Sequence, residues 1–248
     1  MLGLVSVSFR KHTPEEIVAE AKKCGLSYIE WGSDIHAPCN DLDKLKNIKK
    51  LCDENGIICS SYGTYFKIGV TPKDEIYNYI NAAKILGTNI LRLWCGTKKS
   101  ADYTPDEKAE LFRECRALAE VAEAENVFFC MECHSGTYTE TLDGAVELMD
   151  KVNSKNFRMY WQPNQFKSDE ENFKYAEIIA KFTEIIHVFN WTADQWLPLS
   201  GGIEIWKKYL SFFNGTQKLL LEFMPDNRIE SLQVETLALR EIAKGVGI

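Results

Sequence analysis

Three ionisable side chains interrupt stretches of sequence that are otherwise apolar. Glu132 lies in VFFCMEC, His187 in IIHVFNW and Glu222 in KLLLEFM. A carboxylate buried in such a stretch needs a metal ion, a cation or a proton beside it, because an unpaired buried charge is costly. Each residue alone could be a hydrogen-bonded core residue or an exposed edge residue. Their joint appearance at equivalent positions favours a divalent-metal site.

The residues around Glu132 also predict the direction of its side chain. Side chains alternate between the two faces of a β-strand, so Cys130, Glu132 and His134 share one face. If helices cover the opposite, apolar face, the Glu132 carboxylate points inward, and His134 could hydrogen-bond a sugar hydroxyl or support a metal ligand. The residues of the opposite face are Phe129, Met131 and Cys133.

Short apolar runs bounded by turn residues recur along the chain and predict eight strands. Segments with helical spacing lie between them, and three of these begin with a capping threonine, a proline and an acidic first turn, at Thr13, Thr71 and Thr104. Glycines that suit left-handed helix ends stand before the next strand, at Gly25, Gly56 and Gly87. The expected strands are residues 2–8, 26–32, 57–63, 89–95, 127–133, 157–163, 185–191 and 218–224.

The repeat of strand, loop and helix predicts an α/β fold, a single (β/α)8 TIM barrel that forms one domain over residues 1–248. Eight units in 248 residues average about 31 residues, near the minimum for a βαβ repeat, which leaves no room for a second domain. A doubly wound open sheet is the alternative, but the even strand spacing and the lack of a Gly-rich phosphate loop after the first strand argue against it.

Composition restricts the classes of partner. The chain is 45% apolar and 26% charged, with a formal net charge of −7. This negative charge opposes binding to duplex nucleic acid or an anionic membrane. No apolar run is long enough to span a membrane, and the chain opens on the strand-like LGLVSVS, so we expect a cytoplasmic protein. The scattered cysteines are expected to be free thiols.

In such a barrel the chemistry lies at the C-terminal ends of the strands. A buried guanidinium at Arg92 needs an anionic partner, either a substrate group or a nearby glutamate. Tryptophans near the strand ends offer aromatic faces that pack on the apolar side of sugars. The residues expected to bind substrate are His134, Arg92, His36, Trp94, Asn164 and Trp191.

Several motifs together resemble a known family. IEWGSDIHAP, MECHSGTYTET, MYWQPN, HVFNW and LLLEFM follow or form the second, fifth, sixth, seventh and eighth strands. Over essentially its whole length the chain is similar to the xylose-isomerase-like barrels of the sugar phosphate isomerase/epimerase superfamily. The resemblance implies a divalent metal ion (Mn²⁺, Mg²⁺, Co²⁺ or Zn²⁺) held by Glu132, Gln162, His187 and Glu222. It also implies that Glu132 and Glu222 form the catalytic acid/base pair.

Gln162 stands where the family usually has an aspartate. Its amide can still offer a carbonyl oxygen to a metal, but the negative charge is lost. We therefore expect weaker metal binding and a bound metal that is a stronger Lewis acid. The alternative is that Gln162 hydrogen-bonds the substrate or a metal ligand, and that water completes the metal site.

The expected function is that of a carbohydrate isomerase or epimerase. The metal would stabilise the enediolate that forms when a base removes a proton beside a ketone. Two alternatives remain: a dehydratase or lyase that acts on a keto-sugar or inosose at the same metal site, and a barrel that only binds a sugar. The expected partner is a small carbohydrate rather than nucleic acid or a membrane, and a homodimer is an option because barrels of this type often pair.

Overall fold

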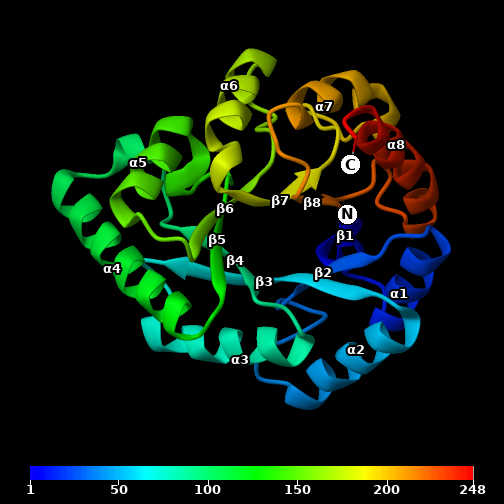
Figure 1. Ribbon diagram of the computed structural model, residues 1–248, viewed down its shortest axis with the longest axis horizontal. Helices are drawn as coiled ribbons and strands as arrows, with labels where there is room; N and C mark the ends of the chain where they lie inside the picture. Colours follow the sequence, from blue (N-terminus) through cyan, green and yellow to red (C-terminus); the bar gives the residue numbers. More distant parts are fainter. Residues whose placement is uncertain (248) are drawn as a thin grey trace.

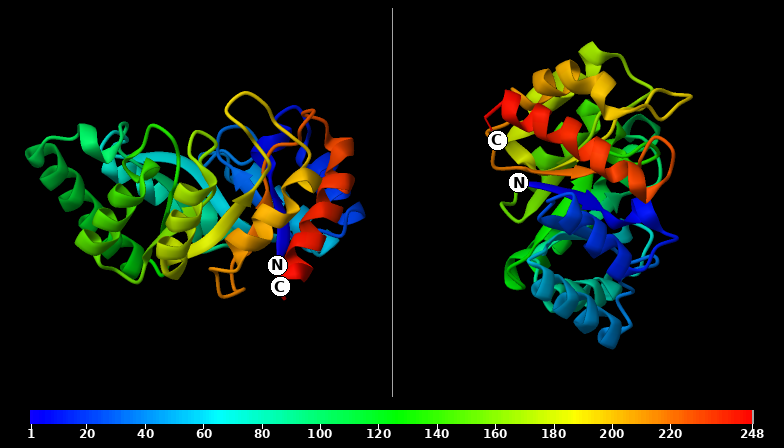
Figure 2. Two further views of the ribbon diagram at one scale, coloured as in Figure 1. Left: turned by 90° about the horizontal axis from the view of Figure 1, so that it is seen from above. Right: turned by 90° about the vertical axis from the view of Figure 1, so that its right-hand side faces the viewer.

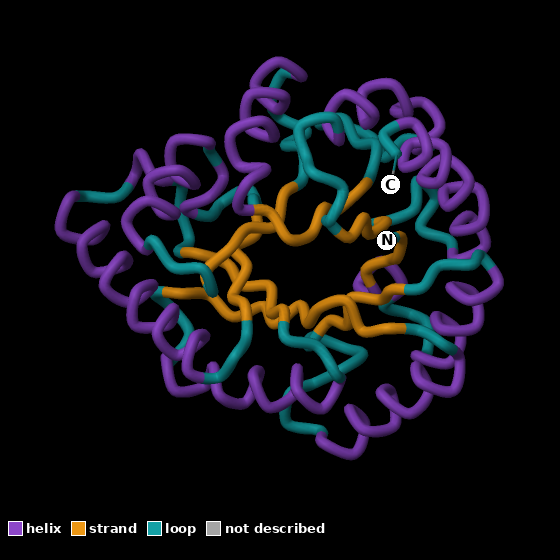
Figure 3. The backbone as a smooth tube through the Cα atoms, in the orientation of Figure 1, coloured by secondary structure: helices purple, strands orange, loops and turns teal. Residues whose placement is uncertain are grey.

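Parallel strands close into a barrel in the computed structural model of the protein, which describes residues 1–247. Each strand pairs with its neighbour in the sequence, and β1 pairs with β8 to complete the ring. Figures 1 and 3 show the strands as an inner ring with the helices around it. The strands are β1 (Leu2–Val5), β2 (Tyr28–Gly32), β3 (Ile58–Ile68), β4 (Ile90–Cys95), β5 (Phe128–Glu132), β6 (Phe157–Trp161), β7 (Thr183–Val188) and β8 (Lys218–Leu221).

A helix follows each strand and returns the chain to the start of the next, which confirms the predicted (β/α)8 TIM barrel. The α-helices of the described chain are α1 (Pro14–Lys23), α2 (Leu42–Asn55), α3 (Ile76–Leu86), α4 (Pro105–Ala124), α5 (Leu142–Val152), α6 (Asp169–Ile179), α7 (Ile203–Leu210) and α8 (Leu232–Gly245). The shorter 3-10 turns are η1 (Ser6–Phe9), η2 (Lys73–Glu75), η3 (Ser100–Asp102), η4 (Tyr138–Glu140), η5 (Ala180–Phe182), η6 (Leu199–Gly202) and η7 (Ile229–Ser231).

Two of the three predicted helix starts have the expected cap. Thr13 and Thr104 each accept a hydrogen bond from the backbone N–H of a glutamate three residues later, whose carboxylate accepts one from the threonine backbone in return. The prediction for Thr71 is wrong, because its hydroxyl accepts a hydrogen bond of 3.0 Å from the backbone N–H of Lys67. The turn η2 intervenes there, and α3 begins at Ile76 without a side-chain cap.

Left-handed residues end several helices, as predicted. Gly25, Gly56 and Gly87 have φ values of 65°, 69° and 80°. Asn126 and Asn153 follow α4 and α5 with φ values of 55° and 47°. Asparagine tolerates this conformation better than most residues, so it replaces glycine at two helix ends where no glycine is present in the sequence.

The strands separate two apolar layers. Phe129, Met131 and Cys133 pack outward in the layer beneath the helices, while Cys130 lies inside the barrel, which confirms the alternation predicted around Glu132. The inner layer consists of Val5, Val7, Ile90, Cys130, Tyr160, Ile185 and Leu220. Two residues further along four of these strands the side chains are charged or ionisable, which places a polar layer above the apolar one. These residues are Arg92, Glu132, His187 and Glu222.

The cysteines are free thiols, as predicted, and all but the half-buried Cys39 are buried. None of the helices in residues 1–247 combines the length and the apolar character that crossing a membrane requires.

Candidate active site

Glu132, His187 and Glu222 converge at the C-terminal end of the barrel. Glu132 ends β5, His187 lies in β7, and Glu222 directly follows β8. His187 Nδ1 lies 3.4 Å from Glu132 Oε1 and 3.5 Å from Glu222 Oε2, and one donor atom from each residue lies within 4.8 Å of the others. Adjacent donors of an octahedral site with bonds of about 2.1 Å are about 3 Å apart, so the donor set suits one divalent cation.

Gln162 brings a fourth oxygen to the same place. Its Oε1 lies 3.1 Å from His187 Nδ1, at the C-terminal end of β6. A neutral amide oxygen is a weaker ligand than a carboxylate, because it lacks the charge that attracts the cation. The position suits both roles that the sequence suggests, a fourth donor to a cation and a hydrogen-bond partner of His187.

His187 is fully buried among carboxylates. Burial lowers the pKa of His187, but Glu222, Glu132 and Glu30 outweigh burial and raise this pKa well above its ordinary value. Because a metal-ligating imidazole is neutral, a cation that binds at Nδ1 must displace a proton from the ring.

Arg92 links Glu132 of the cluster to a second buried carboxylate, Glu30. Its Nη1 donates a hydrogen bond to Glu132 Oε2, and its Nε lies 2.9 Å from Glu30 Oε1. The anionic partners of this buried guanidinium are therefore glutamates of the barrel. Burial raises the pKa of Glu132, but the charge of Arg92 outweighs burial and holds this pKa below its ordinary value.

Glu30 lies inside the barrel and is fully buried. Its Oε2 accepts hydrogen bonds of 2.9 Å from the hydroxyls of Ser61 and Tyr160 and lies 3.6 Å from His187 Nε2. Burial raises the pKa of Glu30, but Arg92 and His187 outweigh it, and the net shift is downward. Glu30 lies within the apolar run LSYIEWG and so carries the same sequence signal as Glu132, but no role is predicted for it from the sequence.

The two glutamates of the cluster are held differently. Glu132 Oε2 accepts hydrogen bonds from Arg92 and from the indole N–H of Trp94. The Glu222 carboxylate lines the cavity, and its contact within residues 1–247 is His187 Nδ1 at 3.5 Å. Glu222 therefore keeps one carboxylate oxygen without a contact from residues 1–247, whereas both oxygens of Glu132 have one.

Glu132, Gln162 and Glu222 line the floor of a cavity of about 350 Å³ at the mouth of the barrel, and His187 lies buried beneath them. One wall consists of Tyr65, Trp94 and His134, whose ring centroids are 5.4 Å and 4.8 Å apart in that order. His134 Nδ1 donates a hydrogen bond of 2.7 Å to the backbone oxygen of Ser135. The second ring nitrogen of His134 is thus an acceptor in the neutral ring.

A second aromatic wall comes from the other side of the ring, after β7 and β8. Trp191 and Trp196 pair through an isolated antiparallel bridge and stack at 5.5 Å, and Trp196 stacks on Phe223 at 5.0 Å. The left view in Figure 2 shows the loop after β7, in yellow, standing above the barrel. Trp94, His134 and Trp191 therefore all line the cavity.

Arg10 and Phe223 also line the cavity, although no role is predicted for them from the sequence. Arg10 Nη2 donates a hydrogen bond of 2.9 Å to the Tyr65 hydroxyl, and Arg10 Nε pairs with Asp34 at 2.8 Å. Tyr65 and Phe223 have φ values of 56° and 51°. Left-handed backbone at a bulky residue is strained and concentrates at functional sites.

Two residues expected to bind substrate do not line this cavity. His36 is buried, and its two ring nitrogens lie 3.2 Å from Ser6 Oγ and 3.1 Å from the His12 backbone oxygen. Asn164 stabilises its own loop, where its Oδ1 accepts a hydrogen bond of 2.9 Å from the Phe166 backbone N–H. These contacts are internal to the protein.

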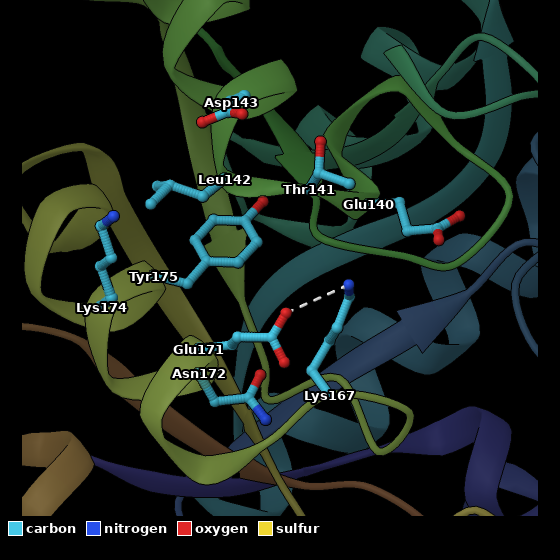
Figure 4. Close-up of a pocket in the computed structure, with 9 residues that line it drawn as sticks. All are labelled: Glu140, Thr141, Leu142, Asp143, Lys167, Glu171, Asn172, Lys174 and Tyr175. Carbon is cyan, nitrogen blue, oxygen red and sulfur yellow. Dashed lines mark hydrogen bonds and ion pairs between the residues drawn. The ribbon is translucent and has the colours of Figure 1, made fainter. Parts of the chain in front are cut away.

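Another pocket, of about 290 Å³, lies outside the barrel mouth, between the N-terminal parts of α5 and α6 (Figure 4). An ion pair of 3.3 Å joins Lys167 and Glu171, and the ring of Tyr175 is seen between Leu142 and Glu171 in Figure 4. None of the predicted site residues lines this pocket, and its acidic and basic side chains are those of an ordinary polar surface.

Comparison with known proteins identifies the family. The family model described as xylose isomerase-like TIM barrel matches residues 18–227. The chain therefore belongs to the xylose isomerase-like TIM barrel family, as the sequence motifs predict. The proteins to which the chain is similar include a dehydratase and epimerases.

Three similar proteins illustrate this range. A 3-dehydroshikimate dehydratase of Bacillus anthracis is 32% identical over 72 residues, which are 29% of this chain and 26% of that protein's length. The crystal structure of the probable 3-DHS dehydratase AsbF of Bacillus anthracis has a TM-score of 0.82 at 20% identity, covering 96% of this chain and 98% of that one. A D-allulose 3-epimerase of Methylomonas sp. has a TM-score of 0.73 at 12% identity, covering 98% and 97%.

Proposed function

We propose that the protein is a divalent-metal-dependent dehydratase that acts on a cyclic hydroxy ketone. The reaction removes a proton from the carbon beside the ketone and expels the hydroxyl from the next carbon. A C–H bond and a C–O bond break, a C=C bond forms, and the proton and the hydroxyl leave as water.

The unequal surroundings of Glu132 and Glu222 carry this proposal. Epimerisation by two bases needs one group to take a proton and a second to return a proton to the opposite face. Glu222 has an oxygen free for the first task, whereas Arg92 and Trp94 already occupy Oε2 of Glu132. Elimination on one face needs a single base, because the proton that Glu222 takes can pass to the departing hydroxyl.

The donor set supports the metal dependence. Glu132, His187 and Glu222 would hold the cation, with Gln162 as a fourth donor. When bound, the cation would polarise the ketone and stabilise the negative charge that develops on its oxygen. Arg92 holds Glu132 in its ionised form, and His134, which lines the cavity, would offer its free ring nitrogen to a substrate hydroxyl.

The aromatic walls support a cyclic substrate. Trp94 lies on one side of the cavity, and Trp191 and Trp196 lie on the other. Flat faces on two sides match a six-membered ring better than an extended chain, since the ring presents flat apolar surface to both. The similarity to a 3-dehydroshikimate dehydratase of Bacillus anthracis supports the same class, and we take 3-dehydroshikimate as the first substrate to test.

Ketose epimerisation is the second candidate. It is favoured by the convergence of two carboxylates on one cavity and by the similarity to a D-allulose 3-epimerase. In that case Glu132 would have to exchange a proton through Oε1, the oxygen that faces His187.

Product analysis separates the candidates. The protein with added Mn²⁺ is incubated with 3-dehydroshikimate, which becomes an aromatic dihydroxybenzoate on loss of water, and the ultraviolet absorbance is followed. In parallel, D-allulose, D-fructose and L-ribulose are incubated in D₂O, and ¹H NMR measures loss of the proton beside the ketone. We expect the aromatic product and no exchange into the ketoses.

The variant Glu222→Gln tests the proposed base. We expect Glu222→Gln to lower kcat by a factor of about 100 to 10,000, the usual contribution of a general base. Proton exchange into a ketose with formation of its epimer, and no aromatic product, would establish the epimerase instead. Saturable binding without turnover of either class would indicate a barrel that only binds its ligand.

A further inference from the structure

Glu30 lies on the inner side of His187, away from the cavity. Nδ1 of His187 faces the oxygens of Glu132, Glu222 and Gln162, while Nε2 faces Glu30 Oε2 at 3.6 Å. We propose that Glu30 is a positioning residue that accepts the Nε2–H of His187 and thereby directs the Nδ1 lone pair to the cation. This inference rests on the metal site of the proposed function.

The chemistry of imidazole requires such an acceptor. A neutral ring carries one proton, so if Nδ1 binds a cation the proton is on Nε2. That nitrogen is buried and has no hydrogen-bond partner of ordinary length within the described chain. A buried N–H without an acceptor is costly, and the Glu30 carboxylate is about 0.4 Å beyond normal hydrogen-bond range.

The Glu30 carboxylate is itself fixed from several strands. Ser61 of β3 and Tyr160 of β6 donate hydrogen bonds to Oε2, and Arg92 of β4 pairs with Oε1. Its rotamer is therefore set before any ligand binds. Arg92 also donates to Glu132, so the same guanidinium orients a metal ligand directly and His187 through Glu30.

Glu30 has no direct part in the reaction. It is fully buried and does not line the cavity, so substrate cannot reach its carboxylate. Its effect passes through His187, as a carboxylate behind a metal-bound histidine fixes the ring's tautomer and orientation.

The first test reads the tautomer in the intact protein. The protein is labelled with ¹⁵N-histidine and loaded with Zn²⁺, which is diamagnetic, and long-range ¹H–¹⁵N NMR locates the ring proton. The chain has only four histidines, so the ring of His187 can be assigned from single substitutions. We expect the proton on Nε2. A proton on Nδ1 would overturn the proposal, and this measurement needs no variant to fold.

The second test compares Glu30→Gln with a charge-matched control. Asp34→Asn removes a carboxylate from the rim, where Asp34 pairs with Arg10, without touching His187. By calorimetry we expect Glu30→Gln to weaken Zn²⁺ binding about 10- to 100-fold, the range for partners behind a ligand, and Asp34→Asn to change it less than about threefold. Equal losses in the two variants, or Glu30→Gln binding as the wild type does, would overturn the positioning role.

These tests separate two failures. If the wild type binds neither Zn²⁺ nor Mn²⁺, the metal site of the proposed function is wrong, and the role of Glu30 falls with it. If the wild type binds the metal and turns over substrate, but the proton is on Nδ1, only the role of Glu30 is wrong.

Discussion

Arg92 and Glu132 form a fully buried ion pair at the floor of the cavity. The same guanidinium contacts Glu30, so one positive charge neutralises part of two negative ones. A charge buried in this way stays ionised only while its partner is present. The pair therefore affects the stability of the barrel as well as the charge and orientation of Glu132.

We predict that Arg92→Met destabilises the protein by about 3 to 5 kcal/mol, because two buried carboxylates lose their counter-charge. Denaturant unfolding at neutral pH measures this. The matched control is Arg158→Met, which breaks the half-buried pair with Glu184 and is expected to cost about 1 kcal/mol or less. Equal losses in both variants would contradict the special status of Arg92.

We predict that Gln162→Asp tightens Mn²⁺ binding about tenfold, because the added negative charge lies beside the other donors. Calorimetry checks this. Gln165→Glu adds the same charge to the cavity wall and serves as the control. Tighter binding by the same factor in both variants would show a general charge effect and leave Gln162 outside the ligand set.

Trp196→Ala is expected to raise KM about three- to tenfold with little change in kcat, since it removes one face of an aromatic wall and no group that exchanges a proton. Steady-state kinetics with the substrate that the product analysis identifies measure the two constants. Phe166→Ala is the control, because Phe166 is an exposed aromatic residue that does not line the cavity. A lower kcat with an unchanged KM would contradict a binding role for Trp196.

We predict that Glu235, which lies outside the cavity, makes the stability of the protein depend on pH. It is buried on α8, where Oε2 accepts a hydrogen bond of 2.8 Å from the Leu199 backbone N–H. Burial, with a smaller contribution from Asp226, raises the pKa of Glu235 above its ordinary value. Because the folded-state pKa of Glu235 is raised, the proton on this carboxyl stabilises the folded protein. This stabilisation is complete below the unfolded-state pKa and is lost as pH rises through the folded-state pKa.

Glu235→Gln keeps an acceptor for Leu199 and removes the charge. We expect it to raise the free energy of unfolding by about 1 kcal/mol at neutral pH, and the gain to disappear at acidic pH, where the wild type is protonated. Thermal unfolding across this pH range measures the difference. Glu241→Gln, at an exposed position on the same helix, should show no such trend.

The barrel is predictable because its signals are local. A threonine followed by proline and glutamate starts α1 and α4, and a glycine with positive φ ends α2. Thr71 shows the limit of such signals. Its hydroxyl has a competing donor in the Lys67 backbone, and the sequence pattern does not reveal which bond forms.

The candidate site is predictable only in part. Glu132, His187 and Glu222 stand out because each is polar within an apolar run. The pairing of Arg92 with Glu30 depends on the strand register, which places Arg92 beside Gly63 of β3, where the missing side chain leaves room for the guanidinium. His36 carries a polar signal too, but its loop turns it into the protein.

The aromatic wall after β7 and β8 could be predicted only in part. Trp191 is expected to bind substrate, but its pairing with Trp196 depends on a loop that bends back on Trp191. Phe223 reaches the cavity through a left-handed backbone conformation. Both depend on contacts between segments that are adjacent only in the folded chain.

The layering of the barrel separates two kinds of evolutionary change. Charged side chains of the strands make the floor of the cavity, whereas aromatic side chains in the loops after β7 and β8 make one of its walls. Because the charged residues of the floor are one another's partners, a substitution of one of them leaves another buried charge without its partner and destabilises the protein. Loop residues such as Trp196 lie outside that set, so we expect substitutions in these loops to change which substrate binds while the charged floor stays the same.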